Sequence, residues 1–263
     1  MTVSNTYTRA LLPMLLLCAF SARAADNEGA ARSADEPESY HWGLGIGADV
    51  RKSPYEGIGS KTTVLPLESF DNRYVRLFGN QFDIKLPSYG AFDFSLRTQI
   101  TLNDGYKASD SPELNGMADR KSAIFVGGAS TWHTDIAKVS VTWMKDISGH
   151  SKGSEFKLNA EHPFQFAERF EIAPHAEFAR LDSKYVNYYY GVHADEATVS
   201  RPEYLGKATS DVQAGVRFGY LFAPKQRLLL DITDTRLGSG ITDSSIVAHR
   251  SMPDVKIGYI YAF

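Results

Sequence analysis

The last ten residues of the chain, 254–263, form the pattern that most limits its fold. Their apolar or aromatic side chains fall at every second position, and the intervening ones are small or charged apart from one isoleucine: the first set is Val255, Ile257, Tyr259, Tyr261 and Phe263. Because successive side chains of a strand point to opposite faces, this alternation predicts a strand with one apolar face. Its length suits a tilted membrane crossing, which takes roughly 9–11 residues. A half-buried terminal strand of a soluble protein fits this ending equally well, so the rest of the chain must decide.

The same two-residue alternation recurs from residue 40 onward. It is clearest in 91–102, where Phe92, Phe94 and Leu96 alternate with Asp93 and other polar side chains. We expect strands at 42–50, 62–67, 73–78, 81–86, 91–102, 122–133, 137–143, 155–161, 170–178, 211–222, 227–232 and 254–263. The pattern predicts an all-β protein, a transmembrane antiparallel up-and-down β-barrel of about 12 strands. The region 51–86 is the least regular, and about 10 strands is the alternative count.

The connections between these strands alternate in length. Short connections are expected at 87–90, 134–135, 163–167 and 223–225, one of medium length at 148–153, and long ones at 103–120, 182–208 and 237–253. Outer-membrane barrels join their strands by short periplasmic turns at one end and longer loops at the other. A soluble sandwich has no reason to keep such an alternation in phase, so the connections favour the membrane barrel.

The start of the chain has the features of an export signal. Arg9 precedes an apolar stretch at 10–20, and Ala22-Arg23-Ala24 fits a cleavage site, so we expect a signal peptide at 1–24. Residues 25–39 are acidic and without periodicity, which predicts a flexible periplasmic segment before a barrel at 40–263. The single cysteine lies inside the apolar stretch, so the mature protein would contain neither disulfides nor cysteine-based metal or catalytic sites.

The composition excludes two classes of protein. Beyond residue 24 no apolar run approaches the roughly 20 residues of a membrane-spanning helix. The mean hydropathy of -0.27 does not argue against a barrel, whose lipid-facing residues alternate with polar ones. The formal net charge of -3 gives no basic excess, so nucleic acid is not an expected partner.

Charged residues of both signs fall on the polar faces of the predicted strands. In a narrow barrel these faces would point into the lumen, where unpaired charges are costly, so we expect cross-lumen ion pairs. The candidates are Arg97, Glu171, His175, Glu177 and Arg217. An acid-base cluster of Glu171, His175 and Glu177 is the catalytic alternative, and ion pairs with Arg97 or Arg217 are favoured over it.

Other catalytic and cofactor patterns do not emerge. The seven histidines lie on different predicted strands and loops without metal-ligand spacing, and no Gly-x-Ser-x-Gly motif is present. We therefore expect neither an enzyme nor a bound cofactor.

An aromatic run, Tyr188-Tyr189-Tyr190, lies in the longest predicted loop. Tyrosine provides large, rigid contact area, so a surface contact for a protein, glycan or lipopolysaccharide is one interpretation. Aromatic packing within the loop is the other, and we favour it. If the run is a contact surface, replacing all three tyrosines by serine should preserve folding and weaken partner binding.

Several short motifs together resemble the MipA/OmpV family of outer-membrane proteins. They are Trp42-Gly-Leu-Gly-Ile46, Ser53-Pro-Tyr-Glu-Gly57, Leu65-Pro-Leu67, Tyr189-Tyr-Gly-Val192, Thr235-Arg-Leu-Gly238, Asp243-Ser-Ser-Ile-Val247 and Tyr259-Ile-Tyr-Ala-Phe263. Ser245 departs from the proline that the family motif would place there. The resemblance implies location in the outer membrane of a Gram-negative cell, in contact with lipid and lipopolysaccharide.

The resemblance also implies a function and partners. One member is regarded as an envelope scaffold that links a lytic transglycosylase, a murein hydrolase, to a penicillin-binding protein, a murein synthase. Other members are described as adhesion, stress-response or porin-like proteins. The ending with Tyr259, Tyr261 and Phe263 resembles the C-terminal signal through which the barrel assembly machinery recognises its substrates.

Overall fold

A computed structural model describes residues 41–102 and 104–263, and the predicted signal peptide and flexible segment lie outside these residues. Thirteen strand segments of the described chain form one sheet. They are β1 (His41–Lys52), β2 (Ser60–Asp71), β3 (Val75–Phe78), β4 (Gln81–Tyr89), β5 (Phe92–Ile100), β6 (Ile124–His133), β7 (Lys138–Asp146), β8 (Ser154–Glu161), β9 (Phe164–Phe166), β10 (Phe170–Leu181), β11 (Thr209–Ala223), β12 (Gln226–Arg236) and β13 (Ser251–Ala262).

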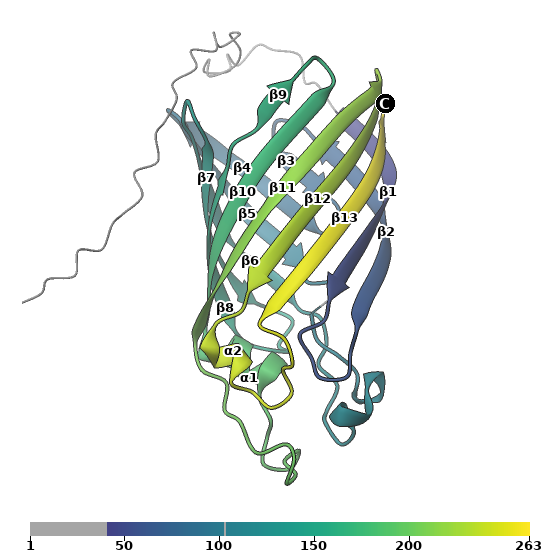
Figure 1. The fold of residues 1–263 in the computed structure, drawn as a ribbon. Helices are drawn as coiled ribbons and strands as arrows, with labels where there is room; N and C mark the ends of the chain where they lie inside the picture. Colours follow the sequence, from purple (N-terminus) through teal and green to yellow (C-terminus); the bar gives the residue numbers. More distant parts are fainter. Residues whose placement is uncertain (1–40, 103) are drawn as a thin grey trace, which may run out of the picture. The chain divides into compact units, whose positions relative to one another are not determined.

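The sheet closes into a barrel of twelve antiparallel wall strands, which confirms the predicted fold class (Figure 1). β8 and β9 pair with successive parts of β10 and together form one interrupted strand. The first and last strands pair directly, with Gly43 opposite Ala262, and β10 pairs with β11. This closure pairs the strands at the two ends of the sheet with each other, as a β protein in lipid requires.

Side chains alternate across the barrel wall as the sequence predicts. Apolar side chains such as Leu44, Phe94 and Ile257 point outward and are exposed, whereas Asp83 and Asp254 on the inner face are buried. An exposed apolar exterior with a buried charged interior is the reverse of a soluble protein and suits a lipid surround.

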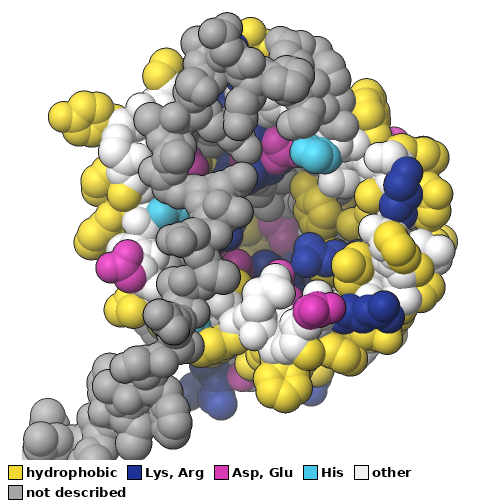
Figure 2. Space-filling view, turned by 90° about the horizontal axis from the view of Figure 1, so that it is seen from above, with side chains coloured by type: hydrophobic (Ala, Val, Ile, Leu, Met, Phe, Trp, Pro, Cys, Tyr) yellow, Lys and Arg dark blue, Asp and Glu magenta, His cyan; other side chains and the backbone are white. Residues whose placement is uncertain are grey.

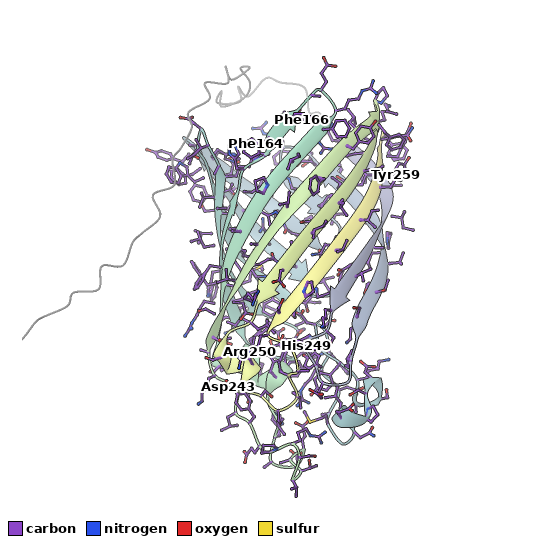
Figure 3. All side chains as sticks on the ribbon, viewed as in Figure 1. Phe164, Phe166, Asp243, His249, Arg250 and Tyr259 are labelled. Carbon is purple, nitrogen blue, oxygen red and sulfur yellow. The ribbon has the colours of Figure 1, made fainter. Side chains whose placement is uncertain are left out.

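The two ends of the barrel differ (Figures 1 and 3). Short turns gather at the end that also holds the C-terminus, together with Phe164, Phe166 and Tyr259. The longer connections gather at the other end, near Asp243 and His249. In outer-membrane barrels, the end with the short turns generally faces the periplasm and the end with the longer loops faces outward.

Several predicted boundaries were wrong. The segment predicted as a poor strand at 62–67 is a full strand, β2, although it contains Pro66. The wall strand continues past Pro163 into β9, so the turn lies at 167–169. β4 extends to Tyr89 through the region predicted as a turn.

The loops contain short helices that the sequence analysis did not predict. They are η1 (Ala108–Asp110), η2 (Pro112–Leu114), α1 (Ser183–Tyr190) and α2 (Ser239–Thr242). No helix of the described chain combines the length and apolar character that a membrane span requires.

Candidate functional site

The lumen of the barrel is lined by ion pairs between neighbouring strands. Arg97 on β5 lies directly opposite Asp83 on β4, and its Nε and Nη2 donate to the two carboxylate oxygens at 2.8 and 3.0 Å. Two parallel bonds to one carboxylate are the strongest geometry for such a pair. The view from the turn end shows a hollow centre with charged side chains deep inside it (Figure 2).

A second group of charges surrounds Arg217 on β11. Its Nη1 lies 2.7 Å from Glu161, and its Nη2 lies 3.3 Å from Asp231, the residue directly opposite on β12. The arginine therefore neutralises carboxylates from strands on both sides of β11. Of the predicted ion-pair residues, the two arginines thus lie in the lumen, with acids other than the predicted ones.

The three predicted acid-base residues on β10 do not act as one cluster. Glu171 pairs with Arg227 at 3.3 Å, whereas His175 Nε2 lies 3.6 Å from Asp231. Glu177 has no ion pair within 4 Å among the described residues. Each of the three residues therefore has its own surroundings, and none of them pairs with Arg97.

His175 fits the wall because the neighbouring position is glycine. Gly215 lies opposite His175 in the ladder, and a Cβ there would come within 2.8 Å of His175 Nε2. The imidazole lies over this glycine with its Nδ1 3.2 Å from the carbonyl oxygen of Ala173. A histidine held in this way packs against the wall of the barrel.

The main apolar core of the described chain lies at the loop end. Buried side chains from the loops and from α1 and α2 pack with Phe125, Met144 and Leu181, which face inward at the rims of β6, β7 and β10. We call this packed loop assembly the cap. Because it rests on inward-facing rim residues, it covers the mouth of the barrel at that end.

The helix α1 forms because its sequence combines a cap residue with helical spacing of apolar groups. The Asp182 side chain accepts a hydrogen bond from Tyr185 N at 2.8 Å and so caps the first turn. Tyr185, Val186, Tyr189 and Tyr190 follow at intervals of one, three and four and are all buried. This spacing is the signal by which the sequence analysis could have found the helix.

The aromatic run therefore does not form the predicted surface contact. Tyr189 is only 1% exposed and Tyr190 is 8% exposed, so neither is available to a partner. Tyr188 is partly buried, and its hydroxyl accepts a hydrogen bond from Lys121 N at 2.8 Å. The favoured alternative, loop packing, describes these residues, and the triple serine variant is now expected to disrupt the cap.

A buried ion pair holds the loops of the cap together. Arg120 Nη2 lies 2.9 and 2.7 Å from the two carboxylate oxygens of Glu196, and both side chains are at least 95% buried. Glu196 also accepts hydrogen bonds from the backbone N–H groups of Ala118 and His193. Burial raises the pKa of Glu196, but these hydrogen bonds outweigh it and lower the pKa to about 2.

A second arginine, Arg201, supports the same region. Its guanidinium donates to the carbonyl oxygens of Glu113, Asn115 and Glu196 at 2.6, 3.0 and 2.8 Å. One side chain thereby joins the loop at 101–123 to the loop at 182–208. Sequence reasoning missed both buried arginines, because an isolated arginine in a polar loop carries no pattern.

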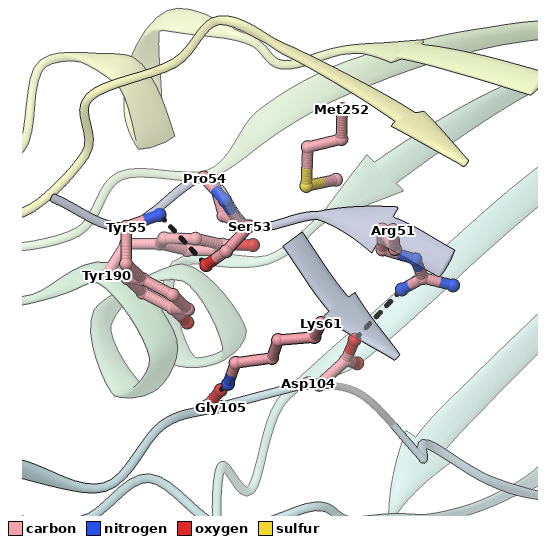
Figure 4. A pocket seen from close by; sticks show the side chains of 9 residues that line it. All are labelled: Arg51, Ser53, Pro54, Tyr55, Lys61, Asp104, Gly105, Tyr190 and Met252. Carbon is pink, nitrogen blue, oxygen red and sulfur yellow. Dashed lines mark hydrogen bonds and ion pairs between the residues drawn. The ribbon is translucent and has the colours of Figure 1, made fainter. Parts of the chain in front are cut away.

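A small cavity lies at one side of the cap. A cavity of about 30 Å³ lies between the cap and the ends of β1 and β2, with Arg51, Lys61, Asp104 and Tyr190 among its lining residues (Figure 4). This volume holds about one water molecule and excludes an organic ligand. Among the described residues, no group of three His, Asp or Glu side chains is placed to hold a metal ion.

The apolar exterior, the charged lumen and the loop cap define an outer-membrane β-barrel protein. The family described as MltA-interacting protein MipA matches residues 44–263, and the chain belongs to this family. The curated relatives are outer-membrane proteins, and the chain is located in the outer membrane.

Two curated relatives and one solved structure illustrate the similarity. Omp26La of Vibrio anguillarum and OmpV of Vibrio cholerae serotype O1 are each 28% identical over 173 residues, covering 65% of this chain. The matched region spans 63% of the length of each relative. An outer-membrane channel from Pseudomonas putida F1 has a TM-score of 0.43 and 9% identity, over 89% of this chain and all of that chain.

Proposed function

We propose that this barrel is an interaction scaffold of the cell envelope, without catalytic activity of its own. The observation that carries this proposal is the cap, which covers the loop end of a lumen lined by ion pairs. A capped barrel offers its turns and loops to partners more readily than it offers a solute pathway.

The partners we propose are murein enzymes, a lytic transglycosylase and a penicillin-binding protein. Support comes from the family's description as MltA-interacting proteins. Such enzymes act in the periplasm, so they would meet the turn end, where Lys225 forms part of the tight turn between β11 and β12. We further propose that Tyr259, Tyr261 and Phe263 are the assembly signal; Tyr261 and Phe263 stack edge to face at that end.

Crosslinking in intact cells tests the scaffold proposal. A photoreactive residue at Lys225 should give adducts with murein hydrolases or synthases, identified by mass spectrometry. The matched control is the same residue at Val199, which is fully exposed at the loop end and should give no such adduct. Equal adducts at both positions, or none with murein enzymes at Lys225, would overturn the proposal.

A small-solute channel is the alternative function, and one observation favours it. The view from the turn end shows a hollow at the centre of the barrel (Figure 2). Planar-bilayer recording distinguishes the two: the scaffold proposal expects no conductance from the intact protein. Steady conductance at neutral pH would favour the channel. A role in adhesion or stress response is a further alternative that the same crosslinking at Val199 would address.

A further inference from the structure

Within the described part of the chain, one wall strand lacks a strand partner on one of its two sides along most of its length. β2 has twelve residues, but β3 has only four, and the two pair only at Ser69, Phe70 and Asp71. The chain turns back at Gly79-Asn80 into β4, which pairs with β3 and β5 and not with β2. We call the remaining part of β2, residues 60–68, the seam. It pairs with β1 on one side and with no strand of the described chain on the other.

The backbone groups that face away from β1 can be assigned. Gly79 N donates to Glu68 O at 3.0 Å, so Glu68 directs its backbone polar groups toward the β3 side. Backbone groups of a strand alternate sides with a period of two residues, so Pro66, Val64 and Thr62 face the same side. Among the described residues these three have no backbone partner on that side.

Proline occurs at a position consistent with an open edge. Pro66 has no N–H to donate, and its missing donor falls on the side that faces away from β1. A proline one residue earlier or later would interrupt the ladder with β1. The edge therefore presents the N–H groups of Thr62 and Val64 and the carbonyl groups of Thr62, Val64 and Pro66.

This edge lies within the apolar band of the barrel. Val64 lies beside Ala48, and Pro66 lies beside Ile46, on the outward face. Val64 is 61% exposed, compared with 41% for Val255, which is paired with a strand on both sides. Unpaired backbone groups are very unfavourable in hydrocarbon, so the membrane-embedded protein needs a partner for them.

We infer that an extended segment of a second, membrane-embedded polypeptide pairs with the seam and occupies the place that β3 leaves empty. An extended backbone presents donors and acceptors at the spacing of this edge, which an acyl chain cannot do. The slot is limited at one end by the Gly79–Glu68 bond and at the other by Lys61, whose Nζ donates to Gly105 O at 2.9 Å. It fits a strand of about five residues.

A different chain is favoured over a second copy of this one. Two copies in one membrane are related by rotation about the membrane normal, so their β2 strands run in the same direction. They would pair in parallel, whereas the continuation of β3 runs antiparallel to β2. The inference concerns the lipid-facing wall and is independent of the murein-enzyme proposal, which concerns the turn end.

A photoreactive residue at Thr62 in intact cells tests the inference, with Val255 on the fully paired β13 as the matched position. We expect a discrete adduct with a second polypeptide at Thr62 and none at Val255. The decisive variant is Val64→Pro, which removes only a seam-facing N–H. It should fold normally, as judged by heat-modifiable gel migration, and reduce the Thr62 adduct at least about tenfold.

Leu65→Pro is the folding control, because Leu65 directs its N–H toward β1, and this variant should fail to fold. Misfolding of Val64→Pro would show that its N–H is used within the barrel and would overturn the inference. Adducts with lipid alone, adducts between two copies, no adduct at Thr62, or an adduct unaffected by Val64→Pro would also overturn it.

Discussion

The cap and the barrel wall place their apolar and charged side chains in opposite ways. The cap buries its apolar side chains, as Tyr189 and Ile241 illustrate, and is stabilised by water exclusion like a soluble protein. The wall exposes its apolar side chains to lipid and buries its charges as ion pairs, as Asp83 and Arg97 illustrate. The same substitution should therefore have different effects in the two regions.

Tyr189→Ala should give the largest effect. Tyr189 is 1% exposed within the cap core, so truncation should leave a cavity and destabilise the cap by about 3–5 kcal/mol. Native-state proteolysis of the 193–203 loop measures this loss. The matched wall variant is Ile257→Ala, whose side chain faces lipid and should leave the proteolysis rate unchanged. An equal response of the two variants would contradict the distinction between cap and wall.

The wall was largely predictable from the sequence, and the reason is visible in particular residues. The alternation of Phe92, Phe94 and Leu96 with polar residues predicts which face of the strand is apolar, because it depends only on neighbouring positions in the sequence. The segment from Tyr185 to Tyr190 instead forms a helix capped by Asp182. A search for two-residue alternation alone does not detect its helical spacing. Local pattern is therefore sufficient for the wall, whereas the cap requires recognition of a second periodicity.

The site residues were less predictable, because their partners are set by register. Arg217 was expected to pair with acids of β10, but the ladder places Asp231 directly opposite it. Arg120 and Glu196 are 76 residues apart, and no spacing rule connects them. Sequence alternation assigns a charge to the lumen, but only the stagger of the strands or the path of the loops selects its partner.

Arg120→Met should have the next largest effect. It leaves the Glu196 carboxylate buried without its guanidinium, which should destabilise the cap by about 3 kcal/mol. The measurement is amide hydrogen exchange in α1, which should accelerate while heat-modifiable migration of the barrel is retained. As a control, Arg236→Met breaks the exposed pair with Asp234 and should change exchange little. If both variants exchange at the wild-type rate, the buried pair does not hold the cap.

Acid should weaken the cap in a defined pH range. The folded pKa of Glu196 is lowered from 4.5 to about 2, so folding favours the ionised carboxylate. Its contribution is fully present above about pH 4.5 and is lost as the pH falls through 2. Proteolysis of the 193–203 loop by an acid-active protease should therefore accelerate across this range. In Glu196→Gln this part of the pH dependence should disappear; its persistence would assign the acid sensitivity to other carboxylates.

Tyr189→Phe should give the smallest effect and separate packing from hydrogen bonding. The Tyr189 hydroxyl donates to Lys121 O at 3.2 Å, while its ring packs against Tyr185 and Tyr188. Removing the hydroxyl alone should cost about 0.5–1.5 kcal/mol, well below the cost of removing the ring. Comparing α1 hydrogen exchange in Tyr189→Phe and Tyr189→Ala measures the two contributions. If the phenylalanine variant were as unstable as the alanine variant, the cap would depend on its polar contacts, and its resemblance to a soluble core would fail.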